Sequence, residues 1–547
     1  MSTVIRSRTA ASVLFMIVFT SSVIAQDSGP AEPSLTEIII PEFVLRVEEL
    51  GVEEVEAVLP NQAELALGQI ALPLPGADEL AVSDIAFDAP LPAVAARSEG
   101  PSVFSTGRLG AGTANRVLGE LSIYKLGADP RFRLGFAHEG LDGFQFNRAG
   151  TGYYAFTNTI DAWLSIQSEN LELEGEAGFV ESEKGLQDES AYNAVSVRAT
   201  DVTAELVYKP DPLLTVTGDV DAGMATRLQT ISGGADPPRD QEYVVEPAVE
   251  ARIDIRSVDL IFSSSYYLRL LAGGAPATRQ DLDFTAGFEA ALPWSVVVAG
   301  HAGVHWDFAS GLEYPWALSV RSLIGDALEV GASGGYQVER TRLSQLWEWE
   351  PLLAVADAVG TPVPTNNSVW YARADARWTG VLGLSLRSEV EFRTESAAFD
   401  LQPYDPASDE FPYLQRSMMS LTPSVQGAWQ PSPVWQLEAG WKGRFIDGPA
   451  VEPSTVLDGA VRFSGRSGFF RADLEVVSEL HPEPNVPWLG LSGTVTAGEG
   501  VELVVELSDL LSPLMDAGRP THGSQVTPEY PFIEPGFVVT IFTRITL

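Results

Sequence analysis

Over most of its length the 547-residue chain alternates apolar and polar residues with a period of two. The alternation starts at about residue 113 and is broken by Gly, Pro, Asp and Asn into segments of roughly ten to fifteen residues. One segment has apolar Leu382, Leu384, Leu386, Val390 and Phe392 alternating with polar Ser385, Arg387, Glu389, Glu391 and Arg393. Because successive side chains of a strand point to opposite faces, the pattern predicts strands with one apolar and one polar face.

The length of these segments distinguishes two kinds of all-β fold. Strands of a soluble sandwich usually have about five or six residues, whereas a tilted strand of about ten residues spans the hydrocarbon layer of a membrane. Arginine or glutamate at every second position suits a water-filled interior. We therefore expect an all-β fold, a large antiparallel transmembrane β-barrel of about 20 to 22 strands over residues 113–547. Leu384 is then expected to face lipid at mid-strand, and Arg387 the lumen.

Aromatic residues and the last segment support the barrel prediction. Tryptophans near strand ends are expected to form a girdle at the lipid headgroups: Trp294, Trp306, Trp316, Trp370, Trp378 and Trp488. The last segment places Phe537, Val539, Ile541, Ile545 and Leu547 on one face. An apolar strand with an unpaired edge invites aggregation, and pairing with the first strand of a barrel removes that edge. Taken alone, this segment fits a buried sandwich strand equally well.

The first residues predict export from the cytoplasm. Arg6 and Arg8 precede an apolar run over 10–19, and small residues lead up to Ala25, so 1–25 reads as a cleaved signal peptide. No later apolar run is long enough for a membrane helix, and the chain has no cysteine. We expect a location in the bacterial outer membrane, with outer-membrane lipid and the barrel assembly machinery as partners.

The formal net charge of −40 excludes one class of partner. Nucleic acid would be repelled by the excess of carboxylates, so no nucleic-acid partner is expected. Two explanations of the charge stay open, namely solvated acidic loops or a lumen that attracts cations.

An acidic, proline-rich arm is predicted over 26–112 because the prolines there prevent long regular strands. It contains one strongly strand-forming segment, which either folds back on the arm or docks another protein as an added strand. The candidate docking residues are Glu37, Ile38, Ile39, Ile40, Phe43 and Val44.

Charged residues on the polar faces of the strands are the candidate lumen-lining residues: Arg373, Arg377, Arg387, Glu389, Glu391, Arg393, Lys442 and Arg444. They either guide a solute or only solvate an inner wall. His301 and His305 share a face of a predicted strand but lie too far apart for one metal ion, so no metal site is expected. No Gly-x-Ser-x-Gly motif and no phosphate-binding loop is present, so we expect neither an enzyme nor a cofactor.

The C-terminal region resembles the end of TonB-dependent receptor barrels. A strand over 501–507 runs into Ser508-Asp509-Leu510-Leu511, and after a loop Glu534-Pro535-Gly536-Phe537 leads into the final strand. The resemblance covers 113–547 in outline and about the last fifty residues in motif. Two features depart from the family: the arm is too short for the usual plug domain, and Leu547 stands where an aromatic residue is common. The first departure puts TonB-driven uptake in doubt.

Two functions follow from this resemblance and from the barrel. One is transport of a small solute, with the arm as a partial plug in a lumen wide enough to need filling. The alternative is a plug-less structural or interaction barrel, or a general porin, whose arm docks a periplasmic partner. The sequence favours transport and does not name the solute.

Overall fold

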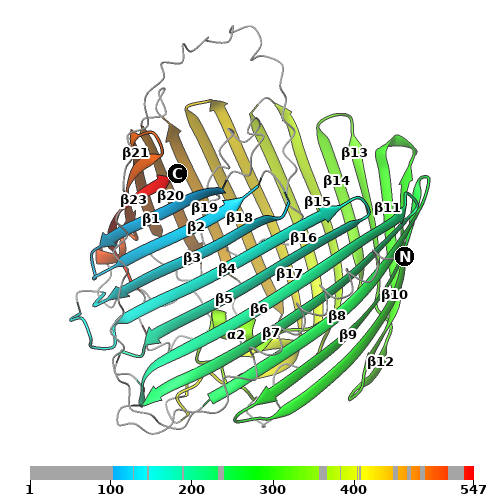
Figure 1. The fold of residues 1–547 in the computed structure, drawn as a ribbon, viewed down its shortest axis with the longest axis horizontal. Helices are drawn as coiled ribbons and strands as arrows, with labels where there is room; N and C mark the ends of the chain where they lie inside the picture. The colour runs from blue at the N-terminus through cyan, green and yellow to red at the C-terminus, as the bar shows by residue number, and fades with distance from the viewer. Residues whose placement is uncertain are drawn as a thin grey trace. The chain divides into compact units, whose positions relative to one another are not determined.

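The computed structural model describes residues 103–547, apart from 127–128, 145–146, 188–189, 232–238, 357–365, 382, 403, 406–407, 448–453, 465–469, 481–486, 515–531 and 533–534. The described strands form one sheet in which each strand pairs antiparallel with its neighbours in sequence (Figure 1). The short β12 and the longer β13 both pair with β11, so together they take one place. Because β23 also pairs with β1, the sheet is a closed barrel of 22 strands, and the predicted fold class is confirmed.

The first half of the barrel contains β1 (Val103–Gly112), β2 (Val117–Lys125), β3 (Arg131–Asp142), β4 (Tyr154–Ser168), β5 (Leu171–Gly185), β6 (Tyr192–Asp211), β7 (Leu214–Ile231), β8 (Arg239–Ile255), β9 (Val258–Ala272), β10 (Ala277–Leu292), the 3-10 helix η3 (Pro293–Ser295) and β11 (Val296–Asp307). The second half contains β12 (Gly311–Glu313), β13 (Trp316–Ile324), β14 (Leu328–Glu339), the helix α2 (Leu343–Trp349), β15 (Asn367–Val381), β16 (Leu384–Leu401), β17 (Tyr413–Ser432), β18 (Trp435–Asp447), β19 (Ser454–Ser464), β20 (Phe470–Leu480), β21 (Trp488–Gly498), β22 (Val501–Ser508), the 3-10 helix η4 (Ser512–Leu514) and β23 (Val538–Thr546). None of the described helices is long and apolar enough to span a bilayer.

The first strand lies inside the segment that the sequence predicted to be irregular arm. β1 occupies residues 103–112, so the barrel begins about ten residues before the expected boundary at 113. Its glycines explain the difference, because they read as breakers in a sequence yet serve here for close packing. A Cβ on Gly110 would lie 2.4 Å from Cβ of Phe542, and one on Gly112 would lie 2.3 Å from the carbonyl oxygen of Val539. The glycines therefore let β1 and β23 approach closely at the closure of the barrel.

The connections at the two ends of the barrel differ in length. At one end, the short-turn end, strands are joined by tight turns such as Arg256–Ser257 and Glu499–Gly500, and both Val103 and Leu547 lie there. At the other, the long-loop end, β14 and β15 are joined by residues 340–366. Outer-membrane barrels place short turns in the periplasm and long loops outside the cell, so the long-loop end is the outer mouth.

The two faces of the strands have the predicted chemistry. On β16, Leu386, Val390 and Phe392 are each more than 40% exposed on the outer face. The rings of Trp316, Tyr336 and Trp370 lie on three neighbouring strands and pack together toward the outer mouth. Trp378 lies eight residues further along β15, which is about 26 Å along the strand and about 20 Å of height after tilt. An apolar band of this height fits a thin outer membrane.

Candidate functional site

The loop between β14 and β15 folds back inside the barrel. Its described first part, residues 340–356, is called the inward loop here and contains the seven-residue helix α2. α2 contacts β6 and β7, and the side chain of Trp347 is completely buried. Figure 1 shows α2 between the near wall of blue and green strands and the far wall of yellow strands. The inward loop therefore occupies the lumen at the outer mouth.

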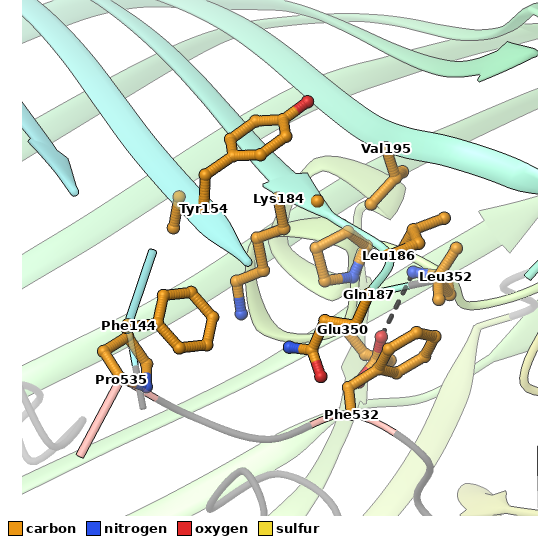
Figure 2. A pocket seen from close by; sticks show the side chains of 13 residues that line it. Phe144, Tyr154, Lys184, Leu186, Gln187, Val195, Glu350, Leu352, Phe532 and Pro535 are labelled. Atoms are coloured by element: carbon orange, nitrogen blue, oxygen red, sulfur yellow. Dashed lines mark hydrogen bonds between the residues drawn. The ribbon is translucent and has the colours of Figure 1, made fainter. Parts of the chain in front are cut away.

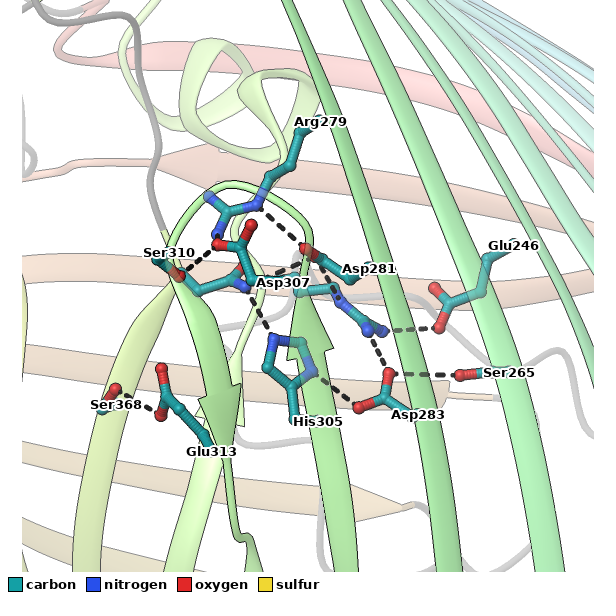
Figure 3. Close-up of polar contacts among 12 residues, drawn as sticks. Glu246, Ser265, Arg279, Asp281, Asp283, His305, Asp307, Ser310, Glu313 and Ser368 are labelled. Carbon is teal, nitrogen blue, oxygen red and sulfur yellow. Dashed lines mark hydrogen bonds and ion pairs between the residues drawn. The ribbon is translucent and has the colours of Figure 1, made fainter.

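Two arginines at the start of the inward loop attach it to carboxylates of the inner wall. Arg340 donates to Glu246 at 2.8 Å, to Asp281 at 3.3 Å and to Asp283, and its guanidinium lies 4.8 Å from the centre of the Tyr267 ring. The three carboxylates that accept these hydrogen bonds, Glu246, Asp281 and Asp283, are labelled in Figure 3. The geometry gives Arg340 an ion pair with each of β8 and β10.

Arg342 makes a second attachment on a different part of the wall. It donates to Asp221 at 2.7 Å and lies 3.7 Å from Asp201 and 3.9 Å from Glu246. Burial alone would lower the pKa of both arginines, but the facing carboxylates outweigh burial and hold the pKa of Arg340 and of Arg342 above the usual value. Both groups thus remain charged at any pH at which cells grow, and only protonation of the carboxylates would weaken the attachment.

The start of α2 is held by a buried carboxylate. The backbone N–H groups of Leu343 and Ser344 each donate to Glu242 at 3.0 Å, and Glu242 is 1% exposed. The first N–H groups of a helix have no partner within the helix, so a carboxylate at this point satisfies them and interacts favourably with the helix dipole. Arg269 on β9 neutralises Glu242 through an ion pair of 2.6 Å.

Arg227 joins the inward loop to a second loop, residues 402–412 between β16 and β17. Its guanidinium donates to the carbonyl oxygen of Leu353 at 2.6 Å and to the carboxylates of Asp240 and Glu410 at 2.7 and 2.6 Å. Its centre lies 5.5 Å from that of the Trp347 ring, and Arg227 is 1% exposed. Deleting one partner of a buried ion pair typically costs about 3 to 5 kcal/mol, so Arg227 is central to the closed arrangement.

An apolar core packs the inward loop against the barrel wall at the outer mouth. It combines side chains from the strands, the inward loop, the 402–412 loop and two further connections, which supply Leu186 and Phe532: Leu186, Val195, Val197, Ala225, Leu343, Trp347, Leu352, Leu353, Ala354, Tyr404, Phe411, Tyr413 and Phe532. The two loops also exchange backbone hydrogen bonds between Leu352 and Phe411 and between Phe411 and Ala354. This core explains why the inward loop is held as a packed layer rather than as a solvated strand.

A small pocket remains beside this core (Figure 2). Its cavity of about 60 Å³ is lined mainly by apolar side chains, including Phe144, Leu186 and Phe532, with Lys184 as the cation among the lining residues. Glu350 accepts a hydrogen bond from the N–H of Leu352 at 3.2 Å at its border. Such a volume holds only a few water molecules, at roughly 30 Å³ of liquid each. The pocket is therefore too small for a solute while the mouth is closed.

Most of the predicted lumen-lining residues pair with one another. Glu389 forms an ion pair of 2.7 Å with Arg373 on the neighbouring strand β15 and one of 3.5 Å with Arg387 on its own strand β16. Arg393 bonds Glu391 at 3.3 Å and Glu339 at 2.6 Å. These residues alternate with the exposed apolar residues of the same strands and so lie on the inner face.

The other three predicted residues also alternate with outward apolar side chains. They are Arg377 on β15 and Lys442 and Arg444 on β18. Among the described residues, none of the ion pairs involves these three cations. Whether any of the predicted residues contacts a solute stays a prediction. The predicted docking residues over 37–44 lie outside the described part of the chain.

The wall opposite β15 to β18 carries an uncompensated row of carboxylates. Glu174 on β5 lies directly across from Glu205 on β6, which lies directly across from Asp219 on β7. Like charges directly opposite each other destabilise a sheet. No ion pair of the described residues includes any of these three carboxylates. The sequence shows the acidic excess but not this row, because the row depends on register.

Comparison with known proteins supports the fold. No family model and no curated protein matches the chain. The siderophore receptor PirA from Pseudomonas aeruginosa matches with a TM-score of 0.59 and 8% identity over 82% of each chain. The copper transporter OprC matches with a TM-score of 0.63 and 10% identity over 82% of this chain and 81% of that one. The FrpB iron transporter from Neisseria meningitidis matches with a TM-score of 0.63 and 6% identity over 82% and 83%.

The barrel resembles those of TonB-dependent receptors. The resemblance predicted from the last fifty residues is thus confirmed for the fold over the whole described barrel. At 6 to 10% identity these matches carry the fold alone. The inward loop and the carboxylates that hold it must therefore be interpreted from their own geometry.

Proposed function

We propose that the protein is an outer-membrane transport protein that admits a small solute through its lumen when the inward loop moves out of the mouth. The observation that carries this proposal is the closed outer mouth. The inward loop is attached through Arg340, Arg342 and Arg227, and it is not covalently fixed, because the chain has no cysteine. A structural barrel through which no solute passes does not need an outer mouth that is closed by a non-covalently held loop. The structural neighbours are receptors and transporters rather than enzymes, and we propose no catalytic role for this chain.

The proposal extends to partners on the periplasmic side. Val103 and Leu547 both lie at the short-turn end, which is the periplasmic side of the barrel, so the proposal looks for a partner on that side. We propose that the segment from Glu37 to Val44 docks TonB or another periplasmic protein by adding a strand to it. The general porin and the plug-less interaction barrel remain the alternatives that the experiment below separates from transport.

Ion conductance tests the proposal directly. The full protein is expected to conduct little in a planar bilayer, since the inward loop closes the outer mouth and the arm, in this proposal, acts as a partial plug. It is compared with three variants. One lacks 26–102 and keeps β1 intact, one has a released inward loop, and the third, the combination, carries both changes. We expect steady conductance from the combination. If the combination stays closed to ions, transport is wrong; if the full protein already conducts steadily, the general porin is correct.

Location is checked by a separate experiment. The protein is expected in the outer-membrane fraction of a sucrose gradient. Without boiling it is expected to migrate anomalously on a denaturing gel, because a closed barrel of 22 strands resists unfolding by detergent. Recovery in the soluble periplasmic fraction would contradict both the location and the function.

A further inference from the structure

Below the inward loop the inner wall has a hollow that the closed mouth does not fill. It is a cavity of about 370 Å³ over β8 to β15, and its polar lining consists of Glu250, Ser263, Thr285, Glu289, His301, Ser319 and Tyr371. His301 lies four residues further from the outer mouth than His305, which accepts a hydrogen bond from the side-chain amide of Asn366 in the loop above. A solute that passes the inward loop would therefore meet this hollow next.

Small residues on the inner face create the hollow. Gly287, His301 and Ala317 lie directly across from one another on β10, β11 and β13, and Ala299 and Ser319 form the neighbouring row. A Cβ on Gly287 would lie 2.9 Å from the carbonyl oxygen of Gly300 and 3.0 Å from Cβ of His301, so a larger residue does not fit there without a shift. The hollow is thus built into the register of the strands.

The charge of the hollow is negative. Its lining contains the carboxylates of Glu250 and Glu289 and no Lys or Arg. Arg252 on β8 donates to Asp259 at 2.9 Å and lies 3.6 Å from Glu289, so Glu289 is partly compensated, and Arg252 interacts more weakly with Glu250. None of the ion pairs in the described part of the chain includes Glu250. Negative charge in a concave site with low-dielectric walls raises the local concentration of cations.

The lining fits an organic cation better than a metal ion. Among the described residues, no three His, Asp or Glu side chains are placed to hold a metal ion together. The hydroxyl groups of Ser263 and Thr285 lie 2.6 Å apart in the cross-strand row that begins at Glu250, and the ring of Tyr371 and the methyl groups of Ala299 and Ala317 supply apolar surface. This combination suits an ammonium group joined to an aliphatic or hydroxylated body.

We propose that this hollow is a binding site for a small aliphatic amine, with Glu250 as the main partner of its ammonium group. The proposal rests on the proposed transport function, because it names the class of solute that the lumen would pass. It uses a part of the wall separate from the contacts of Arg340 and Arg342.

Three probes with the same five-carbon chain test the site by calorimetry on the purified full-length protein. We expect 1,5-diaminopentane to bind at least about tenfold more tightly than 1,5-pentanediol, and glutarate not to bind, because only the diamine carries a cation that can form an ion pair with Glu250. Each titration is repeated on the full-length variant Arg340→Glu with Arg342→Glu, in which the closed mouth no longer restricts access.

Substitutions then locate the site. Glu250→Gln is expected to weaken binding of the diamine about tenfold. Ala317→Leu, which fills the hollow, is expected to abolish it. Glu475→Gln makes the same change as Glu250→Gln on β20, outside the hollow, and is expected to leave binding unchanged. Equal binding of diamine and diol, or equal effects of the two Gln variants, would overturn the proposal.

The outcomes separate this site from transport. The diamine could fail to bind both the unaltered protein and the Arg340→Glu, Arg342→Glu variant while the chain with the released loop and deleted arm conducts. That result would rule out the amine site and leave the transport proposal in place. Binding that depends on Glu250 in a barrel that never conducts removes transport and leaves the site.

Discussion

Reversing the charge of Arg340 and Arg342 together is expected to open the outer mouth. In the double variant Arg340→Glu with Arg342→Glu, two carboxylates would face Asp201, Asp221, Glu246, Asp281 and Asp283, which now hold the loop in place. Hydrogen bonds to charged partners are typically worth about 1.5 to 3 kcal/mol each, and like charges repel. We therefore expect the inward loop to leave the lumen in most molecules.

A single engineered cysteine reports this opening, because the natural chain has none. Ser263→Cys places a thiol in the lumen below the inward loop. In whole cells a membrane-impermeant maleimide should label it at least about tenfold faster in the double variant than in the otherwise unaltered chain, since labelling follows the population of the open form. Fast labelling in both chains would show that the mouth is already open.

The matched control keeps the charge and removes the planar fork of the guanidinium. In Arg340→Lys with Arg342→Lys, each ammonium group still faces carboxylates but cannot bridge several of them in one fixed geometry. Labelling is expected to lie between that of the two other chains. If the Lys and Glu variants label equally fast, packing rather than charge would hold the inward loop.

An arginine at Val390 is expected to destabilise the barrel by about 2 to 4 kcal/mol, the cost of a cation at the middle of the lipid-facing band. Val390 is 45% exposed on the outer face of β16. It lies midway between Leu386, which pairs with Trp378, and Thr394, which pairs with Trp370. The free energy of unfolding in urea, measured in lipid vesicles, checks the value.

The control introduces the same residue on the other face. Ser424 on β17 pairs directly with Glu389 on one side and with Lys442 on the other, so Ser424→Arg adds an arginine to a wet wall between a carboxylate and a cation. We expect a change below about 1 kcal/mol there. Similar losses in the two variants would mean that the faces are assigned wrongly or that the barrel is not in lipid.

The alternation in the sequence predicted the faces well but the ends of the strands poorly. Leu384, expected at mid-strand, is the first residue of β16 and is only half-buried beside Trp429 at the short-turn end. The alternation continues without a break into the turn region. The period of two therefore predicts the face on which a residue lies but does not predict its depth in the membrane. Val390 is for this reason the better test position.

The closed mouth was not predictable from the sequence. Arg340 is separated from Asp281 by 59 residues, and Arg227 from Glu410 by 183. Nothing in the local pattern of residues 340–356 distinguishes a loop that folds into the lumen from one that extends outward. Only the closed sheet and the inward course of the loops bring these charges together, and only the register of neighbouring strands places Glu174, Glu205 and Asp219 in one row.

Arg227 makes the opening of the mouth a cooperative event. The same guanidinium binds the inward loop at Leu353 and the 402–412 loop at Glu410, while Phe411 bonds Leu352 and Ala354. If one loop moved without the other, the buried guanidinium of Arg227 would lose part of its charge compensation. The apolar core that the two loops share would also be partly exposed. States in which only one loop has moved are therefore unfavourable, and we expect the two loops to open together in one cooperative step.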